Sequence, residues 1–320
     1  MPMTAVFTDA STLPLPNHYA GKVRDTYDLG DGRMVFVTSD RLSAFDRAIT
    51  PVPHKGAILN AIARYWFDHT SDIVPNHVIS YPDPNVMIVK KLTMLPVEVV
   101  VRDYMTGTTG TSIWTKYKNG ERTMYGHTFP EGMIKNQKLP ETIITPTTKG
   151  KSDDPISGAE IISSGLVTKD LWEKTERAAL ALFARGRELA ARQGLILVDT
   201  KYEFGTDENG TLHIADEIHT PDSSRYWVAD SYAVRIAAGE DPEGLDKEFV
   251  RKWLVERMED AYKSPLPAIT DEDQAMFSAK YQDLYKRVTG QDFAPATDTA
   301  IETRVLGNLK KALPELNLAA

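Results

Sequence analysis

The sequence predicts an α+β fold in two lobes. Up to residue 103 the chain carries mainly short strand patterns, and long helical patterns dominate the second half. Strand and helix do not alternate regularly, which argues against a parallel sheet built from repeated crossover units. A length of 320 residues exceeds the roughly 150 residues of an average domain. We therefore expect a β-rich lobe at 1–103 and an α+β lobe at 104–320.

The first lobe is expected to contain three strands and one helix. Residues 34–38, 86–89 and 97–101 are rich in β-branched side chains and are bounded by turn formers, as strands are. A helix is expected at 58–69. The segment 106–126 is rich in Gly and Thr, and we predict a loop between the lobes there.

The second lobe is expected to contain one long helix, a strand and further helices. Apolar residues recur with approximately helical spacing over 169–193, with Thr168 placed to cap the start and Gly194 to end the helix. A strand is expected at 195–199. The remaining helical patterns are interpreted as a solvated outer layer and cover residues 231–238, 247–262 and 271–288.

Composition excludes several classes of protein. The chain has 37 Lys and Arg against 45 Asp and Glu, a net charge of −8, which argues against a general nucleic-acid binder. It has no cysteine, so disulfides, iron–sulfur clusters, Cys-ligated zinc and thiol nucleophiles are excluded. No stretch approaches the roughly 18 to 20 apolar residues that cross a bilayer, and no signal peptide is visible. We expect a cytoplasmic protein without a membrane partner.

Several catalytic motifs are absent. The seven histidines form no H-E-x-x-H pair, so a zinc peptidase is not supported. A G-x-S-x-G elbow and a G-x-G-x-x-G fingerprint are also missing, which leaves hydrolase and dinucleotide-binding interpretations without support.

The first candidate site is a glycine followed by two basic residues. Gly21 precedes Lys22 and Arg24, which would project from one face of a strand. There they could contact phosphates, although the segment is not a Walker A loop. The alternative is a solvated edge strand.

The second candidate is the link between two apolar strands at 90–98. A short link containing Pro96 could present unpaired backbone groups to a flat base, with apolar side chains covering the faces of the base. An ordinary bend between strands explains the same residues.

The third candidate is a predicted hairpin with an Asn209-Gly210 turn, the strongest short hairpin signal. With a two-residue turn, Glu203 faces Asp216, and the period of two places Asp199 and Lys201 on the same face. Opposed carboxylates repel unless a positive charge lies between them, and Mg²⁺ held by carboxylates and substrate phosphates would fit. A four-residue loop would change the partner of Glu203, and a solvated hairpin face is the alternative to a metal site.

Two further groups of polar residues follow strands. The segment 220–225 offers hydroxyls, a carboxylate at Asp222 and a guanidinium at Arg225, which suit a sugar phosphate or a carboxylate. Arg102 follows a strand, and polar loops are expected at 39–46 and 54–56.

Taken in order, these segments resemble the SAICAR synthetase (phosphoribosylaminoimidazole-succinocarboxamide synthase) family. Residues 199–205 match its D-x-K-x-E-F-G motif, and residues 96–102 match P-V-E-x-x-V-R. The order of the shorter motifs also agrees, over about residues 18–290: G-K-x-R, S-D-R-x-S-A-F-D, K-G, K-K-L, D-E and P-D-S-S-R. The combination is highly specific.

The resemblance implies a two-lobed SAICAR-synthase fold. Its N-terminal nucleotide lobe would be similar to that of protein kinases, with the active site in the cleft between the lobes. The implied reaction joins L-aspartate to carboxyaminoimidazole ribonucleotide (CAIR), using ATP and Mg²⁺ and yielding SAICAR, ADP and phosphate through an acyl phosphate. Neither nucleic acid nor a membrane is an implied partner, and the oligomeric state is left open.

The resemblance also implies roles for individual residues. The implied catalytic residues are Asp199, Lys149 and Lys201, and the implied metal ligands are Glu203 and Asp216. The nucleotide would be bound by Lys22, Arg24, Met94 and Glu98. The ribonucleotide and the second substrate would be held by Arg41, Ser43, Arg102, Asp222 and Arg225, with a hydroxyl group.

One departure concerns that hydroxyl group. Where the family usually has T-G-S after the arginine, this chain has Thr106-Gly107-Thr108 and then a second Thr-Gly pair before Ser112. Either Thr108 supplies the hydroxyl, or a short insertion transfers the role to Ser112. Two other functions remain as alternatives: a small-molecule kinase, and a nucleotide-binding regulatory module without turnover.

Overall fold

A computed structural model of the protein describes residues 5–45, 47–110, 112–150, 153–245, 248–296 and 300–318. Asp46 and Thr111, which belong to segments discussed above, lie outside the described residues. The chain forms two compact units, which we describe separately. Unit 1 comprises Met1–Tyr65, His77–Leu92 and Lys247–Ala320, and unit 2 comprises Trp66–Asn76 and Thr93–Asp246.

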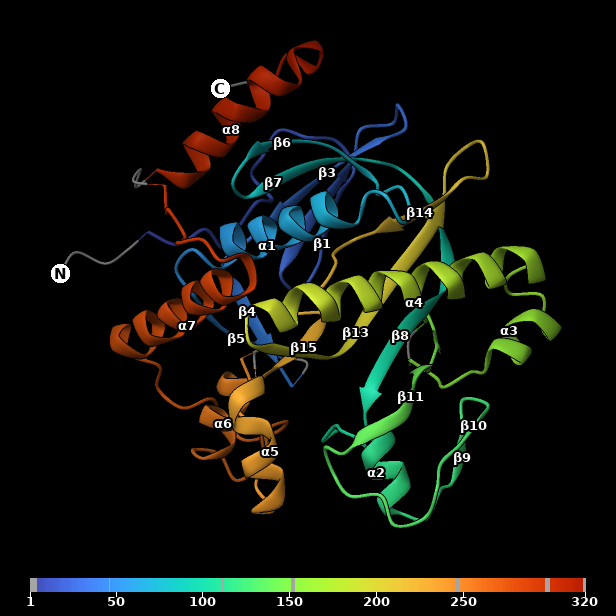
Figure 1. The fold of residues 1–320 in the computed structure, drawn as a ribbon. Helices are drawn as coiled ribbons and strands as arrows, with labels where there is room; N and C mark the ends of the chain where they lie inside the picture. Colours follow the sequence, from blue (N-terminus) through green and yellow to red (C-terminus); the bar gives the residue numbers. More distant parts are fainter. Residues whose placement is uncertain are drawn as a thin grey trace. The chain divides into compact units, whose positions relative to one another are not determined.

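Unit 1 is built on an antiparallel sheet of five strands in the order β1-β2-β3-β7-β6 (Figure 1). Its strands are β1 (His18–Ala20), β2 (Arg24–Asp28), β3 (Arg33–Thr38), β6 (Val78–Asp83) and β7 (Val86–Lys90). The two strands expected at 34–38 and 86–89 are confirmed as β3 and β7, which pair Phe36 with Met87. A separate hairpin joins β4 (Arg41–Ala44) to β5 (Arg47–Pro51), so the segment 39–46 is not the simple loop that we expected.

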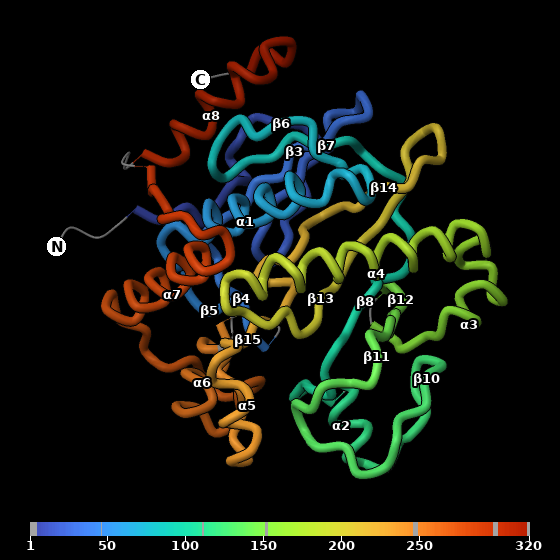
Figure 2. Tube along the Cα trace, viewed as in Figure 1, coloured from blue at the N-terminus to red at the C-terminus, as the bar shows by residue number. Residues whose placement is uncertain are grey.

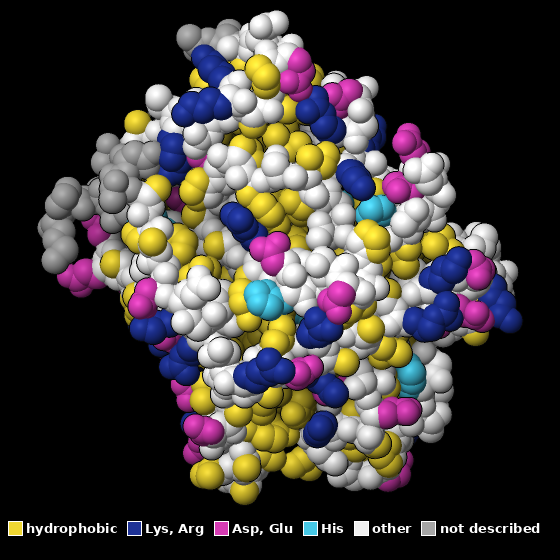
Figure 3. Space-filling model, turned by 45° about the horizontal axis from the view of Figure 1, so that its top comes forward, with side chains coloured by type: hydrophobic (Ala, Val, Ile, Leu, Met, Phe, Trp, Pro, Cys, Tyr) yellow, Lys and Arg dark blue, Asp and Glu magenta, His cyan; other side chains and the backbone are white. Residues whose placement is uncertain are grey.

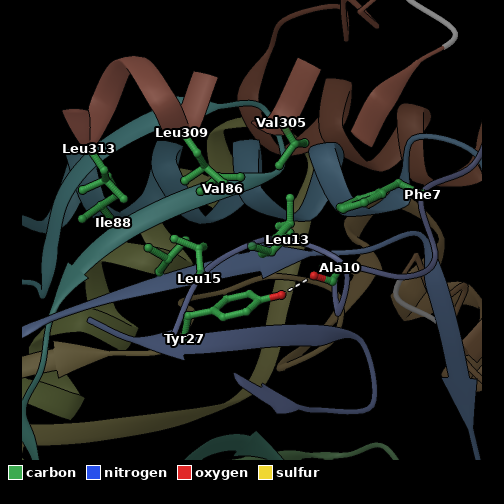
Figure 4. Packing of buried hydrophobic residues seen from close by; sticks show 12 residues of the cluster. Phe7, Ala10, Leu13, Leu15, Tyr27, Val86, Ile88, Val305, Leu309 and Leu313 are labelled. Atoms are coloured by element: carbon green, nitrogen blue, oxygen red, sulfur yellow. Dashed lines mark hydrogen bonds between the residues drawn. The ribbon is translucent and has the colours of Figure 1, made fainter. Parts of the chain in front are cut away.

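The helices of unit 1 bury apolar side chains. In the C-terminal part of the unit these helices are α6 (Glu248–Val255), α7 (Asp271–Thr289) and α8 (Ile301–Ala312), and the short η1 (Pro314–Leu316) follows α8. Figure 4 shows side chains of α8, β7 and the N-terminal segment packing together, among them Val305, Ile88 and Leu13. The fully buried Tyr27 donates its hydroxyl hydrogen to the carbonyl oxygen of Ala10 in the same core.

The helical patterns of residues 247–288 are only partly confirmed. The helix expected at 247–262 is shorter and ends at Val255, and Lys247 lies outside the described residues. Farther along, the chain turns where the Asp260 backbone N–H donates to Ser264 Oγ. Helix α7 is more than a solvated layer, since Phe277 and Tyr281 are buried on one of its faces.

Unit 2 is built on a mainly antiparallel sheet in the order β11-β8-β13-β14, to which β12 and β15 add by pairing with β8 and β13. The strands are β8 (Thr93–Tyr104), β11 (Lys138–Ile144), β12 (Thr147–Thr148), β13 (Leu195–Thr206), β14 (Leu212–Ala215) and β15 (Ser224–Val228). The strands expected at 97–101 and 195–199 are confirmed, but both are twelve residues long. The whole D-x-K-x-E-F-G motif, residues 199–205, therefore lies within β13.

The long helix expected at 169–193 is confirmed as α4 (Lys169–Arg192), which packs on β13 (Figure 2). Its apolar stripe is buried, including Trp172, Leu182 and Phe183. Gly194 follows it with a positive φ of 69°, the left-handed conformation that ends helices and favours glycine. The helix expected at 58–69 is confirmed as α1 (Lys55–Thr70), and the one expected at 231–238 as α5 (Ala229–Ala237).

The segment 106–126 is not a simple loop. It contains α2 (Ile113–Lys118) and β9 (Thr123–Met124), which pairs with β10 (His127–Thr128). Ile113 and Tyr117 are buried in an apolar cluster with Met105 and Phe129. The loop was predicted from the Gly and Thr content of the segment, and the spacing of the apolar residues Ile113 and Tyr117 was too short to indicate a helix. A further helix, α3 (Gly158–Ser163), begins at a capping box formed by Ser157 and Glu160.

The compact units differ from the expected division at residues 103 and 104. Strand β8 pairs with β13 from Thr93 to Arg102, so its contacts group it with the later part of the chain. Residues 247–320 group with the N-terminal strands because α8 packs on their sheet.

The surface and the helices give two further observations. On the face drawn in Figure 3, acidic and basic side chains are interspersed, so the net charge of −8 is not gathered in one patch there. Among the described residues, no helix has the length and apolar character needed to cross a bilayer.

Candidate active site

A row of three charged residues crosses the sheet of unit 2. Asp199 on β13 is the direct partner of Arg102 on β8 and of Arg225 on β15. Arg102 Nη1 lies 2.8 Å and Arg225 Nη1 3.5 Å from Asp199 Oδ2. One carboxylate therefore sits between two guanidinium groups, which leaves a net positive charge that suits an anionic ligand.

The two arginines of this row differ in exposure. The Arg102 side chain is 13% exposed and the Arg225 side chain 29%. Burial lowers the pKa of Arg102, Asp199 opposes this shift, and the charge of Arg225 adds to it. Thr145 Oγ1 accepts a hydrogen bond from Arg102 Nε at 2.9 Å and so fixes the guanidinium plane. No local pattern marks this role of Thr145, because its partner lies 43 residues away along the chain.

A second charged cluster lies farther along β13. Glu203 is the direct partner of Glu98 on β8, and Lys201 Nζ lies 2.6 Å from Glu98 Oε1 and 3.4 Å from Glu203 Oε1. Like charges directly opposite one another destabilise a sheet, and the ammonium group between them relieves the repulsion. Burial lowers the pKa of Lys201, but the carboxylates of Glu98, Glu203 and Asp216 raise it above its usual value overall.

Lys149 adds a second ammonium group to this cluster. It follows β12, and its backbone N–H donates to the carbonyl oxygen of Pro96 at 3.0 Å. Its Nζ forms an ion pair with Glu203 Oε2. Glu203 thus contacts both lysines, and the cluster brings together four residues that the resemblance assigns to the site: Glu98, Lys149, Lys201 and Glu203.

The predicted register of the β13–β14 hairpin is wrong by one residue. Glu203 pairs with Ala215 and not with Asp216. The loop has three residues, because the Gly210 N–H donates to the Asp207 carbonyl and Gly210 adopts a φ of 76°. The Asp207 carboxylate stabilises this longer loop by accepting from the backbone N–H of Asn209 and of Thr211. The carboxylate directly opposite Glu203 is Glu98, which lies on the other neighbouring strand, β8.

Asp216 nevertheless lies near the predicted cluster. It follows β14 with a positive φ of 62°, an unusual conformation for a residue other than glycine. Its carboxylate contributes to the raised pKa of Lys201. Within the part of the chain that the structure describes, no three Asp, Glu or His side chains are close enough to hold one metal ion. The predicted Mg²⁺ site thus remains a prediction.

The segment 220–225 lies against β13. The Lys201 backbone N–H donates to the carbonyl oxygen of Ser223 at 3.0 Å, and Ser224 Oγ donates to Thr200 Oγ1 at 2.7 Å. Asp222 is partly buried, and its N–H donates to Thr220 Oγ1 at 3.3 Å. These bonds hold the segment beside the two charged groups of β13.

The two candidate hydroxyl groups have different surroundings. Ser112 is the N-cap of α2, where its Oγ accepts from the Thr115 N–H at 3.3 Å, and it is 5% exposed. A Cβ atom on Gly107 would lie 2.3 Å from the Cβ of Ser112, so the two residues are in close contact. Thr108 is exposed.

The basic residues of unit 1 do not share one strand. Gly21 and Lys22 lie in the turn between β1 and β2, where the Gly21 N–H donates to the Arg24 carbonyl at 2.8 Å, and only Arg24 belongs to β2. The prediction that both side chains project from one strand face is therefore wrong. The guanidinium of Arg24 lies 5.4 Å from the ring centroid of Phe36.

Arg41 and Ser43 lie on β4, two residues apart. Arg41 Nη2 donates to Asp25 Oδ2 at 2.5 Å, and His18 Nε2 shares a hydrogen bond with Asp25 Oδ1 at 2.8 Å. The Asp25 carboxylate is 1% exposed, so Arg41 has a structural partner in unit 1.

The link between β7 and β8 differs from the prediction. It consists of residues 91–92, and Pro96 lies inside β8 at an irregularity in the pairing with β13. Proline tolerates this position because a bulge removes the need for its missing N–H. Met94, near the start of β8, is 37% exposed.

Comparisons with known proteins agree with the motif order. A family model described as SAICAR synthetase matches residues 17–269. A relative from Agrobacterium fabrum is 56% identical over 96% of this chain and 98% of its own length. The phosphoribosylaminoimidazole-succinocarboxamide synthase of Legionella pneumophila (strain Paris) is 48% identical over 95% of this chain and 97% of that protein.

Solved structures agree as well. The SAICAR synthase of Saccharomyces cerevisiae, solved in complex with SAICAR, has a TM-score of 0.78 and 32% identity, and covers 90% of this chain and 99% of that one. A SAICAR synthetase in complex with ADP has a TM-score of 0.66 and 25% identity, with coverage of 87% and 100%. Because the family model and these relatives extend over most of its length, the chain belongs to the SAICAR synthetase family of enzymes.

Proposed function

We propose that this chain is an ATP-dependent ligase of purine biosynthesis that joins L-aspartate to the carboxylate of CAIR, giving SAICAR, ADP and phosphate. The observation that carries the proposal is the pair of charged groups on β8, β13 and β15, one centred on Asp199 and one on Lys201. The named relatives and the SAICAR and ADP complexes of similar structures support the same reaction.

The chemistry needs activation of a carboxylate, because its oxygen is a poor leaving group. In the proposed first step, a carboxylate oxygen of CAIR attacks the γ-phosphorus of ATP, the bond to ADP breaks, and an acyl phosphate forms. The amine nitrogen of aspartate then attacks the acyl carbon and loses a proton, and phosphate leaves. Cations around the phosphoryl oxygens stabilise the charge that develops in both steps.

The row of Arg102, Asp199 and Arg225 suits the anionic ribonucleotide. A guanidinium group binds phosphate or carboxylate oxygens with two parallel hydrogen bonds, and Arg225 is the more exposed of the two arginines. Asp199 orients both guanidinium groups, and Asp222 lies in the segment that leads into Arg225. We assign these four residues to the ribonucleotide.

The cluster around Lys201 suits the transferred phosphoryl group. Lys201 and Lys149 supply two ammonium groups, and both contact Glu203. The carboxylate oxygens of Glu203 and Asp216 are the hard ligands that Mg²⁺ prefers. The residues present therefore fit the ion by their chemistry, and bound Mg²⁺ would neutralise phosphate oxygens.

The nucleotide roles in this proposal rest on the family motifs. We assign Lys22 and Arg24 to the phosphates of ATP and Met94 to the adenine ring. Glu98, which pairs with Lys201, is also assigned to the nucleotide. The exposed side chains of Lys22 and Met94 support these roles. Arg41 and Ser43 are assigned to the second substrate, and we expect a kinase-like nucleotide lobe and a cytoplasmic location.

Thr108 is proposed as the hydroxyl group that contacts the ribonucleotide. Replacing Thr108 with valine should raise the KM for CAIR about 10-fold, because one hydrogen bond to a charged group is lost. Replacing Ser112 with alanine should instead destabilise the chain by about 1 kcal/mol, because α2 loses its N-cap. Steady-state kinetics and thermal melting separate the two effects, and the reverse assignment would be indicated if only the Ser112 variant had a raised KM.

The function is tested by omitting each substrate in turn from a mixture of ATP, Mg²⁺, CAIR and aspartate. The ligase should form SAICAR and ADP in equal amounts, and only when all substrates are present. ADP formation at full rate without aspartate would indicate a small-molecule kinase. Binding of ATP without release of ADP under any condition would indicate a regulatory module.

A further inference from the structure

The connection between β14 and β15 is anchored by a buried histidine. His219 is fully buried and has a φ of 50°, in the left-handed region. Its Nε2 shares a hydrogen bond with the hydroxyl of Tyr202 on β13, and the hydroxyl of Tyr226 on β15 donates to its carbonyl oxygen at 2.7 Å. Tyr202 and Tyr226 are also fully buried. One residue of the connection thus contacts both neighbouring strands.

A glycine of α4 makes room for this imidazole. A Cβ atom on Gly186 would lie 2.4 Å from His219 Cε1 and 2.7 Å from Leu197 Cδ2. Glycine is unfavourable in the interior of a helix, and the close approach of the imidazole ring explains why Gly186 occurs here. The ring of Trp66 packs edge-on against the imidazole, with centroids 4.7 Å apart. The imidazole is therefore enclosed on several sides.

The anchor lies next to the proposed active-site residues along the chain. Tyr202 stands between Lys201 and Glu203, and side chains alternate along a strand, so it points to the opposite face. Tyr226 follows Arg225 directly. Asp216 precedes His219 in the same connection. Movement of the imidazole would therefore shift the backbone on both sides of the connection.

We propose that His219 is a positioning residue, whose neutral imidazole holds the connection 216–223 against β13 and α4 and so places Asp222 and Arg225 for ribonucleotide binding. The role of those two residues rests on the proposed function. The physical anchor itself does not, because its contacts are formed by Tyr202, Tyr226 and Gly186.

The surroundings of the imidazole favour its neutral form. Its Nδ1 has no hydrogen-bond partner among the described residues, so a proton there would be a buried, unpaired donor. Burial lowers the pKa of His219 to about 3. The titratable side chains that face it are the phenols of Tyr202 and Tyr226, and Trp66 and Gly186 add no charge from their helices. The carboxylate nearest in sequence, Glu217, accepts from the Thr220 hydroxyl.

This environment predicts loss of stability in acid. The folded pKa lies below the unfolded value of about 6.5, so the contribution is complete above pH 6.5 and is lost as the pH falls towards 3. The difference in Tm between pH 7 and pH 4.5 should be smaller in His219→Leu than in the unchanged protein. An equal difference in both proteins would show that the imidazole is not held neutral.

Two variants test the anchor without changing a residue assigned to the ligands. Tyr202→Phe removes only the hydroxyl group, and Gly186→Ala places a methyl group against the imidazole. Gly307→Ala is the matched control for the second, since its added Cβ on α8 would meet nothing within 4 Å. Tyr262→Phe, at a side chain that is 53% exposed, is the control for the first.

The first readout is amide hydrogen exchange at Lys201, Ser223 and Ser224. The backbone N–H groups of these residues donate to carbonyl oxygens of the connection 216–223. Both test variants should exchange at least about 10-fold faster there, and both controls should match the unchanged protein. Unchanged exchange in folded test variants would overturn the anchor, whatever reaction the protein catalyses.

The second readout separates positioning from a merely structural role. Both test variants should raise the KM for CAIR about 10-fold and leave the affinity for metal-free ADP within twofold. Partial unfolding would lower kcat and leave both the KM for CAIR and the affinity for ADP unchanged. That result would contradict a positioning role. Faster exchange in variants of a protein that never forms SAICAR would refute the proposed function and leave the anchor intact.

Discussion

Replacing Glu203 with glutamine is expected to lower kcat more than about 100-fold while the chain still folds. Glutamine keeps the shape of the side chain but removes the charge that Lys149 and Lys201 both contact. The two ammonium groups would then lose their common partner, and Mg²⁺ would lose a proposed ligand. The measurement is SAICAR formation at saturating substrates over a Mg²⁺ titration, with thermal melting to verify the fold.

The matched control for this prediction is Glu208→Gln. Glu208 is an exposed carboxylate in the loop of the same β13–β14 hairpin, and the change removes the same charge. Its activity should match that of the unchanged protein. Asp216→Asn should behave like Glu203→Gln, because Asp216 acts on the same ammonium group. Normal turnover in both Glu203→Gln and Asp216→Asn would remove these carboxylates from the site.

Replacing Arg225 with alanine is expected to raise the KM for CAIR about 10- to 100-fold, since a charge-assisted contact of about 1.5–3 kcal/mol is lost. Arg225 is partly exposed, and Asp199 keeps Arg102 as a partner at 2.8 Å. The fold should therefore survive. Measured KM values for CAIR and ATP test this, and a selective rise for ATP would contradict the assignment.

Arg102 provides an informative contrast with Arg225. Arg102→Met removes the closer and more buried partner of Asp199, so a buried carboxylate loses most of its compensation. We expect the free energy of unfolding to fall by about 3 kcal/mol, in addition to a raised KM for CAIR. Arg192→Ala is the control for both variants, because the ion pair of Arg192 with Glu188 is exposed. It should change neither stability nor kinetics measurably.

Local sequence patterns predicted the long elements well. The apolar stripe and the glycine stop of α4 are local features, and they identified its bounds to within one residue. The strands β3 and β7 were likewise visible from β-branched runs. The short helix α2 was missed because Gly and Thr surround it and only Ile113 and Tyr117 mark its buried side.

The site was predicted in its members more than in its geometry. The motifs identified Arg102, Asp199 and Arg225, and the structure brings these three together across three strands. The motifs also identified Lys149, but its contact with Glu203 spans 54 residues and has no local pattern. Thr145, which orients Arg102, was missed for the same reason.

By itself, the sequence determined the family and the mixed helix and strand composition. It also identified most of the charged residues of the candidate site, because motif spacing and side-chain periodicity are local properties. The tertiary structure decided which charges face one another. The Asp207 side chain stabilises a three-residue loop, which shifts the hairpin register by one and places Ala215 instead of Asp216 opposite Glu203. The separate pairing of β8 with β13 places Glu98 opposite Glu203 on its other side. Because side chains alternate with a period of two, a single residue of loop length is enough to change the partners in a charged cluster.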